Sequence, residues 1–146
     1  MGHIAGGPYL GATPDGRHAS EPLAQGCNPM HGRNTHGITA TMHSLMKLPF
    51  YDISGGICQL EIEPSMFDSE GQGDDYMLAA IETYFKGGGS QVVDNIVSVE
   101  DLEDATEHPE RHQNIVVKVT GYSAHFIQLD KTFQEEIIYR TRHQRM

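Results

Sequence analysis

Gly121 is the residue of this sequence whose type and position point most directly to chemistry. A largely apolar run, residues 116–119, leads up to it, and Tyr122 follows it. Loss of the α-hydrogen from a glycine leaves a carbon radical that no Cβ keeps from becoming planar, so the unpaired electron spreads into the amide on each side. A turn glycine with positive φ is the ordinary alternative. The choice between the two therefore depends on the sequence around Gly121.

The segment 116–143 resembles the C-terminal end of the glycyl radical enzymes, a family that includes pyruvate formate-lyase, glycerol dehydratase, choline lyase and related decarboxylases. Further pieces follow upstream in the family's order: residues 14–17, 21–26, 28–29, 32–33, 37–40, 44–48, 91, 95–98, 102, 104–105 and 108–110. Together they extend the resemblance from about Gly11 to His143. Several ordered pieces are far more specific than one glycine, so the resemblance favours the radical site over the turn glycine.

Two departures from the family pattern flank the glycine. The family usually has Arg where this chain has Lys118, and Ser, Ala or Cys where it has Thr120. Lysine keeps the charge of arginine but loses its planar fork of donors. Because the Gly-Tyr pair and the sequence after it persist, we interpret both changes as adjustments of the site and not as a loss of its function. The sequence of residues 121–126 resembles that of the dehydratase and decarboxylase members more than that of pyruvate formate-lyase.

The resemblance implies a fold and a mechanism. It predicts an α/β fold, the C-terminal portion of a glycyl radical enzyme α/β barrel, with residues 1–146 as one glycyl radical domain. In the family, an iron–sulfur activating enzyme that uses S-adenosylmethionine removes the hydrogen of the glycine that matches Gly121. The stored radical then passes to a cysteine that lies far upstream on a separate loop. The reaction expected is lyase chemistry at a C–C, C–O or C–N bond.

A chain of 146 residues is too short for a complete enzyme of this family. We therefore expect the catalytic cysteine on a larger partner chain, with this chain as a subunit of a split enzyme, the product of a truncated gene or a free-standing radical carrier. The main alternative is a spare part that replaces the oxygen-cleaved end of an intact enzyme. A third class, a nonenzymatic interaction or metal-binding module, also stays open.

Composition excludes other classes of function. Twenty acidic and ten basic residues give a net charge of −10, and no basic cluster is present to displace counterions from nucleic acid. No apolar run is long enough to span a membrane, and the first residues lack a basic region followed by an apolar one. We expect a cytoplasmic protein that binds neither nucleic acid nor membrane.

The two cysteines, Cys27 and Cys58, are too few for a disulfide framework and lack paired zinc-ligand spacing. Free thiols in a reducing compartment are expected. A thiyl-forming role is the alternative, but neither cysteine has the surroundings that the catalytic cysteine has in the dehydratase members. We therefore interpret both as structural thiols.

The elements that must position Gly121 follow from periodicity and from turn residues. Residues 1–37 hold half of the sixteen glycines and show little hydrophobic periodicity, which predicts an extended, loop-rich segment before the α/β region 38–146. Helices are predicted over 38–48, 74–86, 98–107 and from Asp130 onward, strands over 57–62, 91–97 and 115–119, and a short extended segment over 126–129. The strand 115–119 is nearly all apolar, which predicts burial on both faces.

Four other candidates have simpler explanations. Tyr122 could relay a radical but is interpreted as packing over the loop, and His125 as a structural hydrogen-bond partner. His108 and His112 have a spacing that can bind metal on a helix, but Pro109 marks a helix end there. The remaining candidate is an acidic cluster, interpreted as a solvated helix face: Glu100, Asp101, Glu103, Asp104 and Glu107. No metal and no bound cofactor is predicted, and Gly121 is the one catalytic residue.

Overall fold

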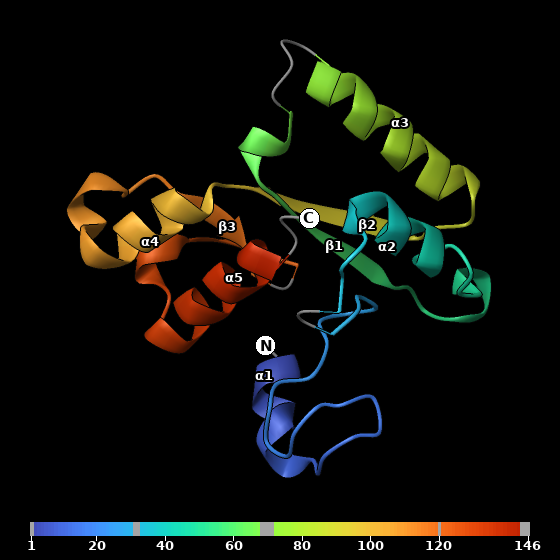
Figure 1. Cartoon of the computed structure of the whole chain (residues 1–146), viewed down its shortest axis with the longest axis horizontal. Helices are drawn as coiled ribbons and strands as arrows, with labels where there is room; N and C mark the ends of the chain where they lie inside the picture. Colours follow the sequence, from blue (N-terminus) through green and yellow to red (C-terminus); the bar gives the residue numbers. More distant parts are fainter. Residues whose placement is uncertain (1, 31–32, 68–71, 120, 144–146) are drawn as a thin grey trace.

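A computed structural model describes residues 2–30, 33–67, 72–119 and 121–143, which form a small mixed α/β fold (Figure 1). The α-helices are α1 (Gly2–Gly6), α2 (Gly37–Leu45), α3 (Gln72–Lys86), α4 (Val99–Glu107) and α5 (Lys131–His143). The strands are β1 (Ile57–Ile62), β2 (Gln91–Ile96), β3 (Val116–Lys118) and β4 (Ser123–His125). Short 3-10 helices occupy Gly7–Tyr9, Phe50–Asp52, Pro64–Phe67, Pro109–Arg111 and Phe126–Gln128. The predicted helices and the strands 57–62 and 91–97 are confirmed.

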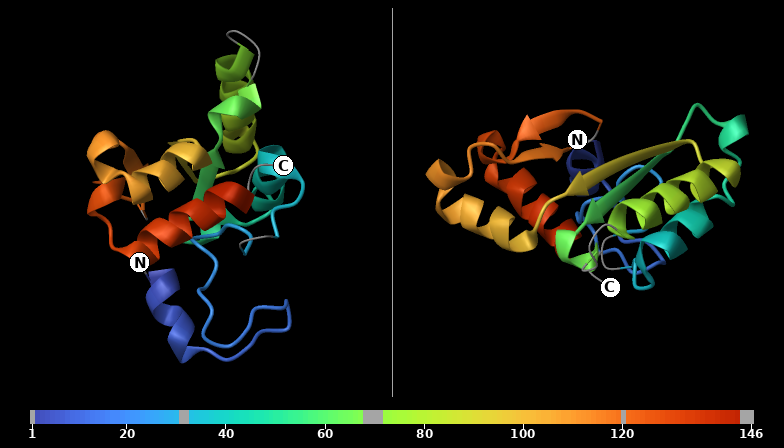
Figure 2. Two further views of the ribbon diagram at one scale, coloured as in Figure 1. Left: turned by 60° about the vertical axis from the view of Figure 1, so that its left-hand side comes forward. Right: turned by 90° about the horizontal axis from the view of Figure 1, so that it is seen from above.

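Strands β1 and β2 form a parallel pair, with Ile57 opposite Gln91 and Ile62 opposite Ile96. A parallel pair needs a crossover connection, and α3 supplies it. Figure 2 shows α3 lying beside the two strands, together with α2. The other edge of β1 is occupied by a side chain: the amide of Asn28 accepts a hydrogen bond from the backbone N–H of Gln59 and donates one to its carbonyl. Asn28 thus takes the place of a neighbouring strand.

Strand β1 is buried on both faces, which its alternation of apolar and polar residues does not predict. Leu60 and Ile62 pack in a hydrophobic cluster on one face. On the other face, Gln59 and Glu61 are also buried, although their side chains are polar. Polar groups inside a protein must be hydrogen-bonded or ion-paired. The inward polar face of β1 therefore identifies a buried polar network, which is described below.

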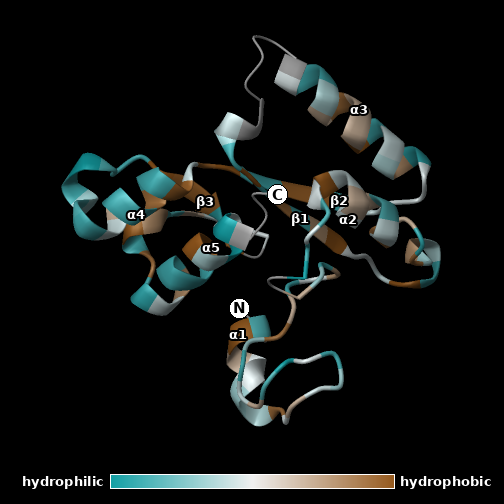
Figure 3. Cartoon of the chain, viewed as in Figure 1, coloured by the Kyte–Doolittle hydropathy of each residue, from teal (hydrophilic) through white to brown (hydrophobic). Residues whose placement is uncertain are grey.

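Two hydrophobic clusters stabilise the fold, and hydrophobic segments accordingly gather along β1 and β2 and again at β3 (Figure 3). The first joins α2, β1 and α3 through Ile38, Met42, Leu45, Phe50, Cys58, Leu60, Ile62 and Tyr84. The second joins α4, β3 and α5 through Leu102, Ala105, Val117, Val119, Phe126 and Ile137. Glu63 ties the two parts together, because its carboxylate accepts a hydrogen bond from the backbone N–H of Val99 at the start of α4.

Strand β3 differs from its prediction. It pairs in antiparallel fashion with β4, which the sequence analysis did not predict, and Lys118 lies opposite Ser123. Only one face is buried: Val117 is 1% exposed and Val116 is 48% exposed. The expectation of burial on both faces is therefore wrong, because the hairpin covers the second cluster from one side only. The alternation in its exposure is the ordinary pattern of an antiparallel ribbon.

The approach to α5 also differs. The segment predicted as extended, 126–129, is mainly a 3-10 helix over Phe126–Gln128. Phe126 is fully buried there, and its backbone N–H donates to the carbonyl of Ile115. Asp130 caps α5 as predicted, since its Oδ1 accepts a hydrogen bond from the N–H of Phe133. Ser98 caps α4 in the same way through the N–H of Asp101.

The N-terminal segment is less irregular than the sequence predicts. Residues 2–9 form α1 and a 3-10 turn, whereas residues 10–30 and 33–36 are loop. Polar side chains attach this loop to the fold: the amide of Gln25 donates to the carbonyl of Val119, and the amide of Asn28 bonds to the backbone of Gln59. The segment is therefore part of the folded unit. In the described part of the chain, no helix is long and apolar enough to cross a membrane.

The glycines after α3 do more than end a helix. Gly88 has a φ of 97°, which suits a residue just beyond a helix C-terminus. At Gly89 an added Cβ would overlap the ring of Tyr84, which is fully buried in the first cluster. Glycine is required at position 89 because it leaves room for this ring.

Gly89→Ala should therefore lower the free energy of unfolding by about 1–3 kcal/mol, the usual cost of overfilling a packed core. Gly11→Ala is the matched control, because no atom lies within 4 Å of a Cβ added there. Urea denaturation of both variants and the wild type measures the effect. Equal unfolding midpoints for the two variants would contradict the packing role of Gly89.

Candidate functional site

Gly121 lies in the loop that joins β3 to β4. The backbone N–H of Val119 donates to the carbonyl of Tyr122 at 3.0 Å, which closes the hairpin around the glycine. Gly121 has a φ of 91°, a conformation that residues with a Cβ rarely adopt. It is exposed, and among the described residues no atom beyond its two chain neighbours lies within 4 Å of the position that a Cβ would occupy. The α-carbon is thus accessible from outside the chain.

This geometry fits both interpretations of the glycine. A positive φ is what a turn glycine needs, and it explains the residue type without further chemistry. The exposed α-carbon, however, also leaves its hydrogen open to a reactant. Of the two departures from the family pattern, Lys118 lies on the outer side of the hairpin, where its ammonium donates to Oγ of Ser123 at 2.8 Å. Thr120 lies outside the described residues.

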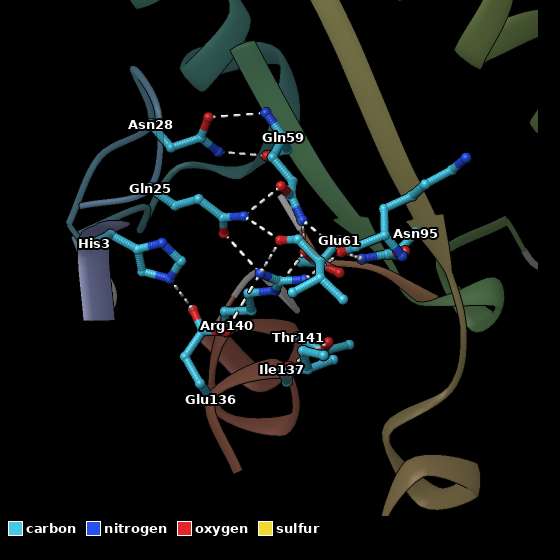
Figure 4. Close-up of polar contacts among 12 residues, drawn as sticks. His3, Gln25, Asn28, Gln59, Glu61, Asn95, Glu136, Ile137, Arg140 and Thr141 are labelled. Carbon is cyan, nitrogen blue, oxygen red and sulfur yellow. Dashed lines mark hydrogen bonds and ion pairs between the residues drawn. The ribbon is translucent and has the colours of Figure 1, made fainter. Parts of the chain in front are cut away.

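A buried polar network holds the strand that leads to Gly121 (Figure 4). At its centre is Arg140 of α5, which is 2% exposed. Its Nε lies 2.7 Å from a carboxylate oxygen of Glu61, and Nη1 lies 3.4 Å from a carboxylate oxygen of Glu136. Further out, Nε2 of His3 lies 3.3 Å from the other oxygen of Glu136, so that α1 also contacts the network.

The same network reaches the backbone of β3. Arg140 donates to the carbonyls of Lys118 and Val119. On the same edge of β3, away from β4, the amide of Asn95 accepts from the N–H of Lys118 and donates to its carbonyl, as a neighbouring strand would. The backbone before the glycine is therefore held by side chains on one edge and by β4 on the other.

Glu61 is the titrating group of this network. Burial raises the pKa of Glu61 to about 7, although Arg140 and the amides of Asn95 and Gln59 act to lower it. Removal from water penalises a carboxylate strongly, and one guanidinium shared between two carboxylates offsets only part of that penalty. Glu61 is therefore far more easily protonated than an exposed glutamate.

Neither cysteine belongs to the site. Cys58 is fully buried in the first cluster, and burial, with a further effect of Cys27, raises the pKa of its thiol to about 12. Cys27 is half-buried and packs against the same cluster. Val119, which precedes the glycine loop, belongs to the second cluster. This arrangement supports the interpretation of both cysteines as structural thiols.

The other predicted candidates lie apart from the network. Tyr122 is 42% exposed. His125 is at an exposed position in β4, opposite Val116. His112 lies next to Asp104, with 2.6 Å between its Nε2 and a carboxylate oxygen. Among the described residues, no group of three or more histidine, cysteine or acidic side chains is arranged to hold a metal ion.

The acidic cluster on α4 is confirmed as a solvated face. Glu100, Asp101 and Glu107 are exposed, and Glu103 is paired at the surface with Arg142 of α5. A cavity of about 520 Å³ opens between the N-terminal segment and α5, with Arg17, Glu136 and Tyr139 in its wall. None of the described residues of the β3–β4 hairpin lines it. The cavity is thus separate from the glycine loop.

Sequence reasoning missed the network residues. Gln25 lies in a segment predicted as loop, and Arg140 lies in the helix predicted from Asp130 onward, where no role was assigned to it. The available signal was the polar alternation in β1, since Gln59 and Glu61 face the interior. It could have predicted that a buried cation must come from elsewhere in the chain, but not which one.

The sequence and the fold of this chain are similar to those of known proteins. Residues 23–127, which include Gly121, match the protein family described as "Glycine radical". The chain is 40% identical over 134 residues to the probable dehydratase YbiW of Escherichia coli (strain K12), a match that covers 90% of this chain and 16% of the relative.

Solved structures give the same result. The B12-independent glycerol dehydratase from Clostridium butyricum, in its glycerol-bound form, superposes with a TM-score of 0.88 and 36% identity, over 95% of this chain and 18% of that one. A structure from Roseburia inulinivorans that concerns 1,2-propanediol dehydration has the same TM-score, identity and coverage. The chain thus spans less than a fifth of each of these relatives.

Glu61→Gln should flatten the dependence of stability on pH. Because the pKa of Glu61 is raised from 4.5 to about 7, the folded chain binds this proton more tightly than the unfolded chain does. The stabilisation of the folded chain by this bound proton is complete below pH 4.5 and is lost as the pH rises through about 7. The free energy of unfolding of the wild type should fall over this window, by on the order of 3 kcal/mol from this group.

Urea denaturation at about pH 5 and about pH 8 tests this linkage. In Glu61→Gln the difference between the two pH values should shrink, because the amide does not titrate. Glu103→Gln, which removes a surface carboxylate, should keep the difference seen in the wild type. Parallel stability curves for wild type and Glu61→Gln would show that the buried carboxyl does not titrate in this range.

Proposed function

Because this chain belongs to the glycyl radical enzyme family, we propose that it stores a radical on Gly121 and passes it to a cysteine on a larger partner chain. It would thus be the radical-bearing subunit or fragment of a radical lyase, dehydratase or decarboxylase. The observation that carries the proposal is that Gly121 lies inside the matched region with an exposed α-carbon and no atom near its missing Cβ.

The chemistry requires a hydrogen atom to leave Gly121. An activating enzyme that uses an iron–sulfur cluster and S-adenosylmethionine would supply the radical chemistry that removes this α-hydrogen atom. The glycine carbon becomes planar, and the two flanking amides share the unpaired electron. A cysteine S–H then returns a hydrogen atom to Gly121 and becomes a thiyl radical, which acts on the substrate.

The cysteine that takes part belongs on another chain. Cys58 is buried in the first cluster and Cys27 packs against it, whereas the glycine loop extends from the second. Most of the length of each relative has no counterpart in these residues. We place the thiyl cysteine and the residues around the substrate in that remainder, on the larger partner chain, and the assembly in the cytoplasm.

The parallel pair of β1 and β2 supports a partner. Parallel sheets occur almost only where both faces are covered, and a two-stranded sheet is rarely stable by itself. Apolar Ile96 of β2 is nevertheless 58% exposed. We propose that the partner continues this sheet into the α/β barrel expected for the family.

Dehydration is the reaction class we favour. The relative from Escherichia coli is named a probable dehydratase, and the structures from Clostridium butyricum and Roseburia inulinivorans concern the dehydration of a polyol or diol. We therefore propose that the assembled enzyme breaks a C–O bond next to a carbon radical on the substrate.

The spare-part alternative makes a different demand on the chain. Gln25 donates to the carbonyl of Val119 at 2.7 Å, so the N-terminal segment supports the glycine loop directly. A replacement part would need this segment as much as a subunit would, and its presence does not separate the two functions. Restored activity of an oxygen-cleaved intact enzyme on addition of this chain would favour the spare part.

Anaerobic incubation with a cognate activating enzyme should produce the electron paramagnetic resonance doublet of a glycyl radical. Gly121→Ala should abolish it, because alanine brings a Cβ that opposes the planar radical. Gly88→Ala is the matched control: Gly88 has a similar φ of 97° and equally open surroundings, so the backbone strain is alike. A doublet of unchanged shape in Gly121→Ala would refute the assignment.

Air should cut the activated chain at Gly121. Oxygen adds to a carbon-centred radical, and the backbone then breaks at that residue. Mass spectrometry should detect the release of the segment 122–146 in proportion to the spin measured before exposure. An intact chain after a confirmed doublet would place the radical on another residue.

A further inference from the structure

The carbonyl of Lys118 is held by three side chains that come from three different elements. Nη2 of Arg140 donates to it at 2.8 Å, the amide of Asn95 at 3.1 Å and the amide of Gln59 at 3.2 Å. These donors belong to α5, β2 and β1. Such a concentration of donors on one backbone oxygen fixes its position more firmly than the single bond of an ordinary strand pair.

The next carbonyl, that of Val119, is held in the same way. Gln25 donates to it at 2.7 Å, and Nη1 of Arg140 lies 3.5 Å from it. The other end of the Gln25 amide accepts from Nη1 of Arg140 at 2.7 Å, so Arg140 also orients the side chain that holds Val119. Gly121 lies two residues after Val119 in the sequence.

We propose that Arg140 is a positioning residue for the radical site: its guanidinium, through the carbonyls of Lys118 and Val119, sets where Gly121 lies. This inference rests on the proposed function, because the position of Gly121 matters in this way only if the glycine carries the radical. Transfer of a hydrogen atom requires the reacting atoms to lie close together in the correct orientation, and a displacement of about 1 Å can reduce a rate about 100-fold. Val117 and Val119 pack the base of the hairpin in the second cluster, but hydrophobic packing tolerates small shifts, whereas hydrogen bonds depend on direction.

The competing explanation is that Arg140 only balances charge. It faces two carboxylates, Glu61 of β1 and Glu136 of its own helix, and His3 of α1 lies beyond the second. A buried cation is needed there whatever holds the hairpin. The two roles use different properties of the side chain, since charge balance needs a cation and the two carbonyls need a planar fork with several donors.

Arg140→Lys separates the two roles because it keeps the charge and loses the fork. Hydrogen exchange of the full chain, followed residue by residue by NMR, measures the outcome. The amide of Val119, which closes the hairpin, and that of Lys118, which bonds to Asn95, should exchange at least tenfold faster. The amide of Leu102, in the helix packed behind β3, should keep its wild-type rate.

Arg142→Lys is the control, since it makes the same substitution on the same helix in a surface pair with Glu103. It should leave the exchange at Val119 unchanged. Should Arg140→Lys fail to fold, Gln25→Met removes a donor to Val119 without a change of charge and should accelerate the same amides. Wild-type exchange in the hairpin of the lysine variant, or equal acceleration at Val119 and Leu102, would overturn the proposal.

Electron paramagnetic resonance on the same variants keeps this inference distinct from the proposed function. A wild-type chain that shows no doublet after activation would end the proposed function, and with it the purpose of the positioning. If the wild type forms the doublet and the hairpin of Arg140→Lys exchanges as in the wild type, the proposed function stands and the role of Arg140 is refuted.

Discussion

The buried ion pair between Arg140 and Glu61 is the interaction on which the rest of the structure depends. It joins α5 to β1 at a place where both side chains are withdrawn from water. Such a pair gains little net stability, because desolvation consumes much of the attraction. Its value lies in arrangement: with Nε of the guanidinium held by Glu61, the other two nitrogens reach Glu136, Gln25 and the carbonyls of Lys118 and Val119.

The network also explains why two separate hydrophobic clusters form one fold. The first cluster contains β1 and the second contains β3 and α5, and the polar groups lie between them. Hydrophobic packing is tolerant of small shifts, whereas hydrogen bonds depend on direction. The clusters thus supply most of the stabilising burial, and the polar groups fix how one cluster is oriented relative to the other.

The sequence predicted the local elements well and the long-range ones poorly. Helices α3, α4 and α5 carry their own signals, such as apolar spacing, Ser98 and Asp130 as caps and glycines after α3. Strand β3 was predicted as buried on both faces because its composition is apolar, but β4 and the exposed side of the hairpin depend on chain reversal at Gly121. The pairing of Arg140 with Glu61 depends on tertiary structure alone. Gly121 itself was identified through family resemblance, since its φ and exposure fit an ordinary turn equally well.

The hydrogen bond between Glu63 and the start of α4 has a consequence for how the chain folds. Glu63, at the end of β1, accepts the hydrogen bond from Val99, 36 residues later, and Gln25 contacts Arg140 across 115 residues. Contacts between residues so far apart in sequence form slowly, because the entropy of closing a long loop is lost before the bond can form. We expect the helices and the β3–β4 hairpin, whose contacts are local, to form before these long-range bonds. The glycine loop would then reach its native position only when Gln25 and Arg140 fix the hairpin relative to the rest of the chain.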